Sequence, residues 1–170
     1  MIEIVPITLA HIDGFHRTLD FIARERRYLA LLEAPPLESM HAFIPDIIKK
    51  GHPQFVVLSD GEVVGWCDVL PKTWPIYAHT GVLGVALLPA LRGQGLGRRL
   101  IERALQAAQA FGLSRVELTV REDNRTAIAL YRKLGFVTEG LKRNALRIDD
   151  RYENQVLMAL LFEANHPRET

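Results

Sequence analysis

The chain has 170 residues, of which 48% are hydrophobic and 24% are charged, and its 21 basic residues almost balance its 20 acidic ones. This composition is that of one ordinary globular domain, and it excludes a disordered tail protein. A formal charge of +1 argues against nucleic acid as a partner, because a nucleic-acid-binding surface usually carries a basic excess. The single cysteine, Cys67, excludes an intrachain disulfide and a metal site built on several cysteines.

The sequence also bears on location. No apolar run approaches the roughly 18 residues needed to span a bilayer. The N-terminal segment lacks the basic stretch and apolar core of a secretory signal. A lone cysteine is typical of a reducing compartment. We therefore expect a cytoplasmic protein with no membrane partner.

The first half of the chain predicts a strand, two amphipathic helices and then three strands. Thr8 is expected to cap the first helix, and Gly51 to end the second. Asp60-Gly61 is a strong hairpin signal, and Pro89 stops the last of these strands. The expected ranges are 2–7 for the first strand, 8–27 and about 40–50 for the helices, and 54–59, 62–70 and 79–88 for the strands.

The second half predicts a helix, a strand, a helix and a final group of strands. Gly112 and Gly135 end the two helices, and Asp149-Asp150 forms the last turn. The fold is therefore a mixed α+β domain over residues 1–163, an antiparallel meander followed by a strand–helix–strand unit, with a flexible tail at 164–170. The expected ranges are 96–111 and 124–134 for the helices and 115–120 for the strand between them. A further strand is expected to start at 136–137, and the final hairpin to have strands near 141–147 and 152–161.

A glycine-rich turn at 92–97, Arg-Gly-Gln-Gly-Leu-Gly, joins a predicted strand to a predicted helix. Unpaired N–H groups and the positive dipole end at a helix N-terminus attract phosphate, and glycines let the backbone approach an anion closely. Arg98 and Arg99 add positive charge, and residues 92–103 carry four arginines against Glu102, a net charge of +3. The turn therefore indicates an anion site, with a tight turn that binds no ligand as the alternative.

The spacing of the glycines excludes two familiar phosphate motifs. A P-loop requires a lysine followed by serine or threonine after its last glycine, and the turn has neither. A dinucleotide fingerprint requires Gly-x-Gly-x-x-Gly, but the last position holds Arg98 when counted from Gly93 and Leu100 when counted from Gly95.

Two motifs in order resemble the GNAT superfamily of acyl-CoA-dependent N-acetyltransferases. Arg92, Gly95 and Gly97 fill its Arg/Gln-x-x-Gly-x-Gly/Ala loop, and residues 124–136 are similar to its Asn-x-x-Ala-x-x-x-Tyr-x-Lys-x-Gly-Phe segment. The resemblance covers nearly the whole chain. It implies a mostly antiparallel sheet of about seven strands flanked by about four helices, with two strands splayed apart at the acyl-CoA site.

The resemblance implies acetyl-CoA as co-substrate, no metal, and direct attack of a primary amine on the thioester with no acyl-enzyme. The thioester arm would lie between the splayed strands, with the Leu87 N–H polarising its carbonyl. Cys67 is then unnecessary as a nucleophile and is expected to be structural. The residues expected to bind the cofactor are Val85, Ala86, Leu87, Arg92, Gly93, Gln94, Gly95, Leu96, Gly97, Arg98 and Asn124.

The resemblance also implies an acid and a base. Tyr131 matches the general acid, and its phenol, with an ordinary pKa of about 10, is protonated at neutral pH. The position of the glutamate base in many relatives falls at Gly81, and no acid lies between His79 and Leu91. His79, on the same strand face, is the first candidate for the base. Weaker candidates are Glu33, His41, Asp68 and a water relay.

The acceptor pocket is implied to lie between the first two helices, their connection and the final hairpin. The run from Arg24 to Tyr28 has two interpretations, a group that holds an acceptor carboxylate and a solvated helix face. The segment 144–152 is similar to bacterial members that acetylate amino acids, small amines or protein N-termini, and these members often form homodimers. The alternative function is an acyl-CoA-binding sensor or accessory module with little catalysis.

Overall fold

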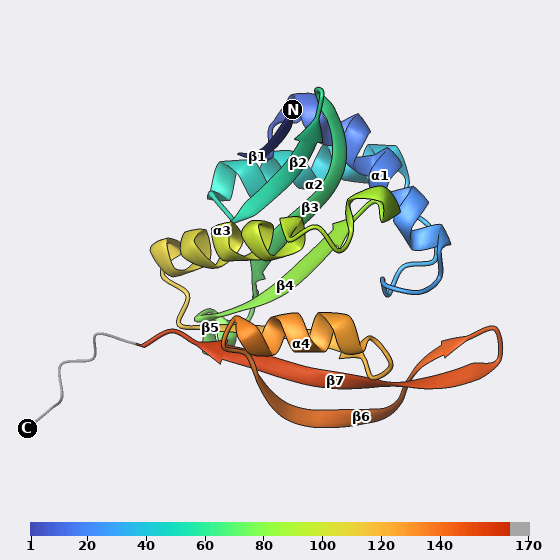
Figure 1. The fold of residues 1–170 in the computed structure, drawn as a ribbon. Coiled ribbons are helices and arrows are strands. Elements are labelled where there is room, and N and C mark those ends of the chain that lie inside the picture. Colours follow the sequence, from blue (N-terminus) through green and yellow to red (C-terminus); the bar gives the residue numbers. More distant parts are fainter. Residues whose placement is uncertain (164–170) are drawn as a thin grey trace, which may run out of the picture.

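A computed structural model describes residues 1–163 and contains seven strands and four α-helices (Figure 1). The predicted tail at 164–170 lies outside the described residues. Short 3₁₀ turns precede α1, β4 and α3. The elements are β1 (Ile2–Pro6), α1 (Ile12–Arg24), α2 (Leu37–Lys50), β2 (Gln54–Ser59), β3 (Glu62–Pro71), β4 (Thr80–Leu87), α3 (Leu96–Phe111), β5 (Arg115–Arg121), α4 (Arg125–Lys133), β6 (Val137–Ile148) and β7 (Arg151–Leu161).

The strands form one sheet in the order β1-β2-β3-β4-β5-β7-β6. Only β4 and β5 pair in parallel, since the α3 crossover between them returns the chain in the same direction, and the other neighbours are antiparallel. The predicted α+β fold with a mostly antiparallel sheet of seven strands is confirmed. Among residues 1–163 no helix combines the length and apolarity that a bilayer crossing requires.

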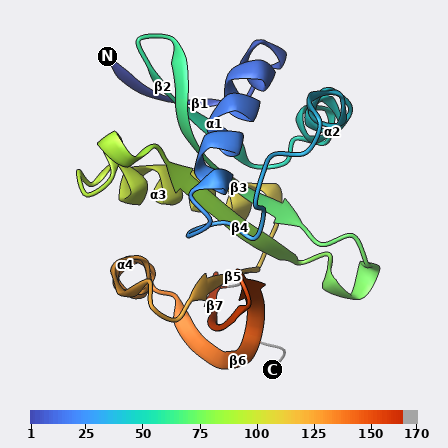
Figure 2. The same ribbon diagram turned by 90° about the vertical axis from the view of Figure 1, so that its right-hand side faces the viewer.

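Helices cover both faces of the sheet (Figure 2). On one face, Trp66 of β3 packs with the buried stripe of α1, where Phe15 meets it edge-on at 5.2 Å between ring centroids. On the other face, Cys67 packs in the larger core with α3 and with Tyr131 of α4. Because side chains alternate along a strand, Trp66 and Asp68 of β3 face α1 and α2, and Cys67 and Val69 face α3.

Two predicted boundaries are wrong. The helix expected from Thr8 to Arg27 is a 3₁₀ turn followed by α1, which ends at Arg24, and Arg26 already has a positive φ of 55°. The separate strands expected at 136–137 and 141–147 are one strand, β6. Its pairing with β7 shifts register twice, so the extra residues break the alternation that marks a strand in sequence.

Candidate active site

β4 loses its partner on one side part-way along its length. It pairs with β5 only from Thr80 to Val82, whereas it stays paired with β3 as far as Leu87. The two parallel strands therefore diverge after Val82, and Figure 1 shows β4 leaving the line of β5 and β7. This is the splay that the resemblance implied.

The register shows which backbone groups of β4 bond to β3. The Leu88 N–H donates to the Val64 carbonyl at 2.9 Å, and the Lys72 N–H donates to the Thr80 carbonyl at 2.9 Å. Both bonds join even-numbered residues on each side. In an antiparallel pair, hydrogen-bonded and non-hydrogen-bonded positions alternate. The even-numbered residues of β4 therefore direct their backbone groups to β3, and the odd-numbered ones direct theirs to the opposite side.

This alternation sorts the three residues predicted to bind the thioester arm. The N–H groups of Val85 and Leu87 point toward the side from which β5 has diverged. Ala86 pairs with Trp66, so its backbone groups point to β3 and not into the splay. Two of the three residues are thus placed to donate to a ligand between the strands.

The glycine turn leaves the N-terminus of α3 accessible. Gly93 and Gly95 have φ values of 74° and 77°, and no atom lies within 4 Å of where a Cβ would stand on either. Gly95 is the N-cap of α3 and has no side chain to occupy the first N–H groups of the helix. The neighbouring Gln94 is used inside the turn, where its amide donates to the Ala90 carbonyl at 2.7 Å.

The side chain of Arg92 is engaged within the protein. Its guanidinium pairs with both carboxylate oxygens of Glu25, at 3.0 and 2.5 Å, and its Nε donates to the Leu87 carbonyl at 2.8 Å. It also stacks over the Tyr28 ring at 4.5 Å. Arg98 likewise pairs with Glu102 at 2.8 Å. Arg92 therefore fixes the segment after α1 to the glycine turn.

Tyr131 lies near Cys67 of β3, the strand next to β4. It is buried in the same core as Cys67, and Cys67 is the register partner of Val85. The pKa of the Tyr131 phenol is raised well above its ordinary value, mainly by burial and to a smaller extent by the nearby Cys67. The phenol is thus protonated at neutral pH. Asn124 caps α4, since its Oδ1 accepts from the Ala127 N–H at 3.2 Å.

His79 is not brought to this place. It is exposed and immediately precedes β4. At roughly 3.3 Å per residue along a strand, the six steps from His79 to Val85 span about 20 Å. A base must reach its proton directly or through one water. The position of His79 therefore does not support its predicted role as the base. Glu33 is exposed beside Arg24 at 3.5 Å, and His41 pairs with Asp13 at 2.9 Å on the surface.

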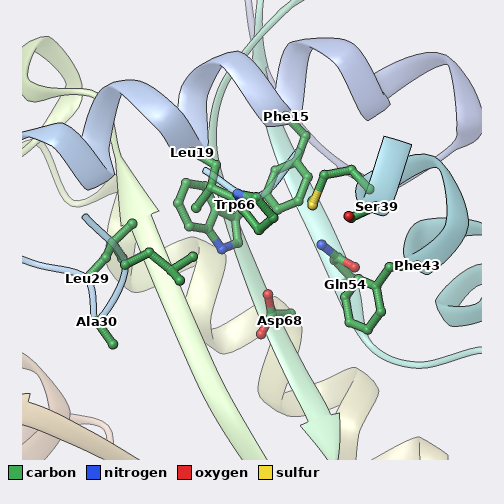
Figure 3. A pocket seen from close by; sticks show the side chains of 12 residues that line it. Phe15, Leu19, Leu29, Ala30, Ser39, Phe43, Gln54, Trp66 and Asp68 are labelled. Carbon is green, nitrogen blue, oxygen red and sulfur yellow. The ribbon is translucent and has the colours of Figure 1, made fainter. Parts of the chain in front are cut away.

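An apolar cavity of about 490 Å³ lies between α1, α2 and the sheet, and Asp68 opens onto it (Figure 3). Burial raises the pKa of the Asp68 carboxyl to about 7, and the Gly84 backbone amide offsets part of that rise. A Cβ on Gly84 would stand 3.1 Å from the Asp68 Oδ1, so the glycine gives the carboxylate room. One feature of the sequence could have indicated Asp68, namely that it is an acidic residue inside a mostly apolar strand.

A family model described as "Acetyltransferase (GNAT) family" matches residues 18–136. The chain belongs to this family. The GNAT chain is 40% identical over 92 residues to an N-alpha-acetyltransferase of Mycobacterium tuberculosis, over 53% of this chain and 55% of that protein. It is 37% identical over 79 residues to the ribosomal protein bS18-alanine N-acetyltransferase of Escherichia coli, over 46% and 53% respectively.

The matched segments cover only part of each curated relative. The GNAT chain spans about half the length of these curated relatives. A solved structure, a phosphinothricin acetyltransferase from Sinorhizobium meliloti in complex with acetyl-CoA, superposes with a TM-score of 0.89 at 20% identity, over 99% of this chain and 93% of that one. At that identity the likeness shows the fold.

The residues of this GNAT chain fit acetyl-CoA. The odd-numbered N–H groups of β4 beyond Val82 are free of β5, and a pantetheine arm can pair with them. The turn at 92–97 keeps the space that a Cβ would fill, at the start of a helix of 16 residues. Leu96 is buried, which fixes the first turn of α3 against the core. In residues 1–163 no three His, Cys, Asp or Glu side chains gather as a metal site.

Proposed function

We propose that the protein is an N-acetyltransferase that moves an acetyl group from acetyl-CoA to a primary amine by direct attack on the thioester. The observation that carries this is the divergence of β4 from β5 after Val82, beside the uncapped glycine turn and at the level of Tyr131. A slot with free backbone donors, an anion site and a protonated phenol together suit a thioester joined to a phosphorylated carrier.

Each residue has a separate task. The residues to hold acetyl-CoA are those of the glycine turn, with Arg92 as its support, and Asn124. Bound acetyl-CoA supplies a thioester carbonyl carbon as the electrophile. The Leu87 N–H donates to the carbonyl oxygen, where negative charge grows during attack. Tyr131 donates its proton to the departing sulfur.

The protein itself forms no covalent bond in this scheme. Cys67 is fully buried, and burial, with Asp68 nearby, raises the pKa of its thiol well above its ordinary value, so it stays protonated and inert. Overall, the ammonium loses two protons, the new C–N bond replaces the C–S bond, and the sulfur gains one proton. The products are an N-acetyl amine, CoA and one proton released to solvent.

The acceptor is a small-molecule amine or a peptide N-terminus. The name of the Escherichia coli relative specifies an alanine of ribosomal protein bS18, and that of the Sinorhizobium meliloti neighbour specifies phosphinothricin. The single buried thiol accords with a reducing compartment, so a cytoplasmic site of action is part of the proposal.

Calorimetry and a thiol assay test the function. Acetyl-CoA is expected to bind to the purified protein in a way that ATP and NAD do not displace, and CoA release is expected in the presence of a panel of amines and N-terminal peptides. Absence of acetyl-CoA binding contradicts the whole proposal. Binding with no CoA release on any amine favours the sensor or accessory function.

A further inference from the structure

The cavity under α1 and α2 has apolar walls and a polar floor. Aromatic and aliphatic side chains of both helices and of the segment between them form the walls, and Gln54 of β2 and Asp68 of β3 form the floor (Figure 3). Gln54 and Asp68 are register partners on adjacent strands, so their side chains lie side by side on one face. The wall includes the aromatic rings of Phe15 and Trp66 and the exposed Ser39 of α2.

Gln54 is a buried polar side chain that lacks a partner. Its side chain is 4% exposed, and its Oε1 makes no hydrogen bond to the described protein. Rotating the carboxamide by 180° exchanges its oxygen and nitrogen, so the oxygen can face the cavity. A buried carboxamide oxygen without a donor costs free energy, and in the rotated orientation this oxygen can accept from a ligand ammonium in the cavity.

Among residues 1–163, no basic side chain lines the cavity. The basic residues at the end of α1 and just after it have other partners: Arg24 pairs with Asp20 at 2.7 Å, Arg26 pairs with Asp149 at 2.6 Å, and Arg27 stacks on Tyr28 at 5.6 Å. A carboxylate on the acceptor would therefore find no cation here and would lie near the Asp68 carboxyl, which repels it.

Resting on the acetyl-transfer function above, we infer that this cavity takes a primary amine bearing a bulky aliphatic or aromatic group and no carboxylate beside the nitrogen. Gln54 and Asp68 hold its ammonium, and Asp68 is the general base. The shared chemistry has two sources, a free hydrophobic amine and the N-terminal residue of a peptide with an apolar side chain.

Asp68 and Tyr131 lie on opposite faces of β4. Asp68 reaches across the strand at Gly84, its register partner, from the α1 and α2 face, and Tyr131 lies near Cys67 in the core on the α3 face. The ammonium gives one proton to Asp68, which passes it to solvent. The freed lone pair forms the C–N bond, the C–S bond breaks, and the sulfur takes the Tyr131 proton. The nitrogen then releases its second proton, which restores the phenol.

The titratable groups around Asp68 are few. On α1, His16 bonds to the Pro35 carbonyl at 2.8 Å, and on α2, His41 is held by Asp13. Cys67 lies on the other face of β3, protonated. From β2 and β4 the facing groups, Gln54 and the Gly84 amide, do not titrate. Asp68 is thus the group in the cavity whose ionisation follows pH near neutrality.

The experiment compares acceptors and variants in the CoA-release assay. The acceptors are phenethylamine, phenylalanine, the peptide Phe-Gly-Gly and methylamine. If the natural acceptor is a free amine, phenethylamine should exceed phenylalanine at least tenfold in kcat/KM. If it is a peptide N-terminus, Phe-Gly-Gly should exceed phenylalanine by the same factor. Asp68→Asn is expected to lower kcat at least 100-fold, to remove the acidic limb of the pH profile near 7, and to leave acetyl-CoA affinity within twofold.

A second variant separates the cavity from the base. Ser39→Phe places a ring at the cavity rim and is expected to raise KM for phenethylamine at least tenfold. Asp46→Asn, on the exposed side of α2 beside Lys50, is the control and keeps wild-type values. Equal use of phenylalanine, or full activity of Asp68→Asn, overturns the inference while leaving acetyl transfer standing. Failure of acetyl transfer shows separately, as no CoA release from any amine.

Discussion

At the scale of single residues, Tyr131 tests the leaving-group side of the reaction. Tyr131→Phe keeps the ring that packs against Phe136 at 5.8 Å and removes only the hydroxyl. Because proton donation by a positioned side chain contributes about 10²–10⁴-fold, kcat should fall by at least about 100-fold. The Kd of acetyl-CoA should stay within twofold, since backbone groups bind it. Tyr77→Phe, on an exposed tyrosine, is the matched control, and unchanged kcat in Tyr131→Phe would remove the phenol from the mechanism.

Asp68 leaves a separate signature in stability. Its pKa is raised from 3.8 to about 7, so between these values the folded protein holds a proton that the unfolded chain has lost. Stability rises with pH only where the unfolded state binds more protons, so here the contribution of Asp68 falls as pH rises from about 4 to 7. The free energy of unfolding of Asp68→Asn relative to wild type should therefore increase across this window, by up to about 4 kcal/mol.

Denaturant titrations at several pH values measure that difference. Gln54→Leu changes the same cavity floor without removing a titratable group, so its difference from wild type should not vary with pH. A pH-independent difference for Asp68→Asn would mean that the carboxyl is ionised in the folded protein throughout this range. The acid limb proposed for catalysis would then need another group.

At the scale of elements, Arg92 and Glu25 join the segment after α1 to the turn before α3. Their side chains are 29% and 24% exposed, and the contact is bidentate. A double-mutant cycle of Glu25→Ala and Arg92→Ala in urea should therefore give a coupling of about 1–2 kcal/mol. The exposed Arg98–Glu102 pair should give less than about 0.5 kcal/mol in the same cycle. Equal couplings would show that Arg92 does not fix this segment.

The glycine turn allows a matched comparison of two left-handed glycines. Gly95 has a φ of 77° and Gly61, in the β2–β3 hairpin, has a φ of 86°, and neither Cβ position meets an atom within 4 Å. Alanine at either position should therefore cost about 1–2 kcal/mol of stability through backbone strain alone. Only Gly95→Ala should also weaken acetyl-CoA binding, by about tenfold, because its Cβ meets the ligand. Calorimetry decides, and equal Kd values would move the phosphate site elsewhere.

The same elements show what sequence could predict. Gly51 and Gly112 end α2 and α3 in the left-handed conformation, as their positions indicated, and the Asp60-Gly61 turn joins strands at the expected residues. These are local signals. Two other features depend on residues far away in the sequence, so no local pattern predicts them. They are the two register shifts in the pairing of β6 with β7, and the ion pair of Arg92 with Glu25, which lie 67 residues apart.

The candidate site divides in the same way. The resemblance to the GNAT motif points to Tyr131 and Asn124, and the helix with its Asn124 cap is a local feature that the sequence predicts. The sequence favours His79 as the base because the period of a strand predicts which face a residue lies on. That period does not predict how far the residue lies from the reacting atoms. Asp68 was ranked low because its importance comes from α1 and α2 closing a cavity over it, which is a tertiary feature.

At the scale of the whole molecule, Cys67 reports on every opening that exposes the core. It is the single cysteine, it is fully buried between the sheet and α3, and its strand partner is Val85 in the splay. A thiol reagent can therefore react only with molecules in which this region has opened, and such molecules have lost the proposed acetyl-CoA site. Ligand that binds only the closed form lowers the open population by the factor 1 + [L]/Kd. Labelling at 100 times Kd should thus slow about 100-fold.

Acetyl-CoA suits this measurement because it has no free thiol of its own. Labelling followed by mass spectrometry at increasing acetyl-CoA should give a Kd equal to that from calorimetry, since both report one binding equilibrium. Gly95→Ala should shift the two values together, whereas Gly61→Ala should speed labelling through lower stability and leave the Kd unchanged. Labelling that is indifferent to acetyl-CoA would mean that Cys67 is exposed by an opening that leaves the binding site intact. The β3–β4 register that links Cys67 to Val85 argues against such an opening.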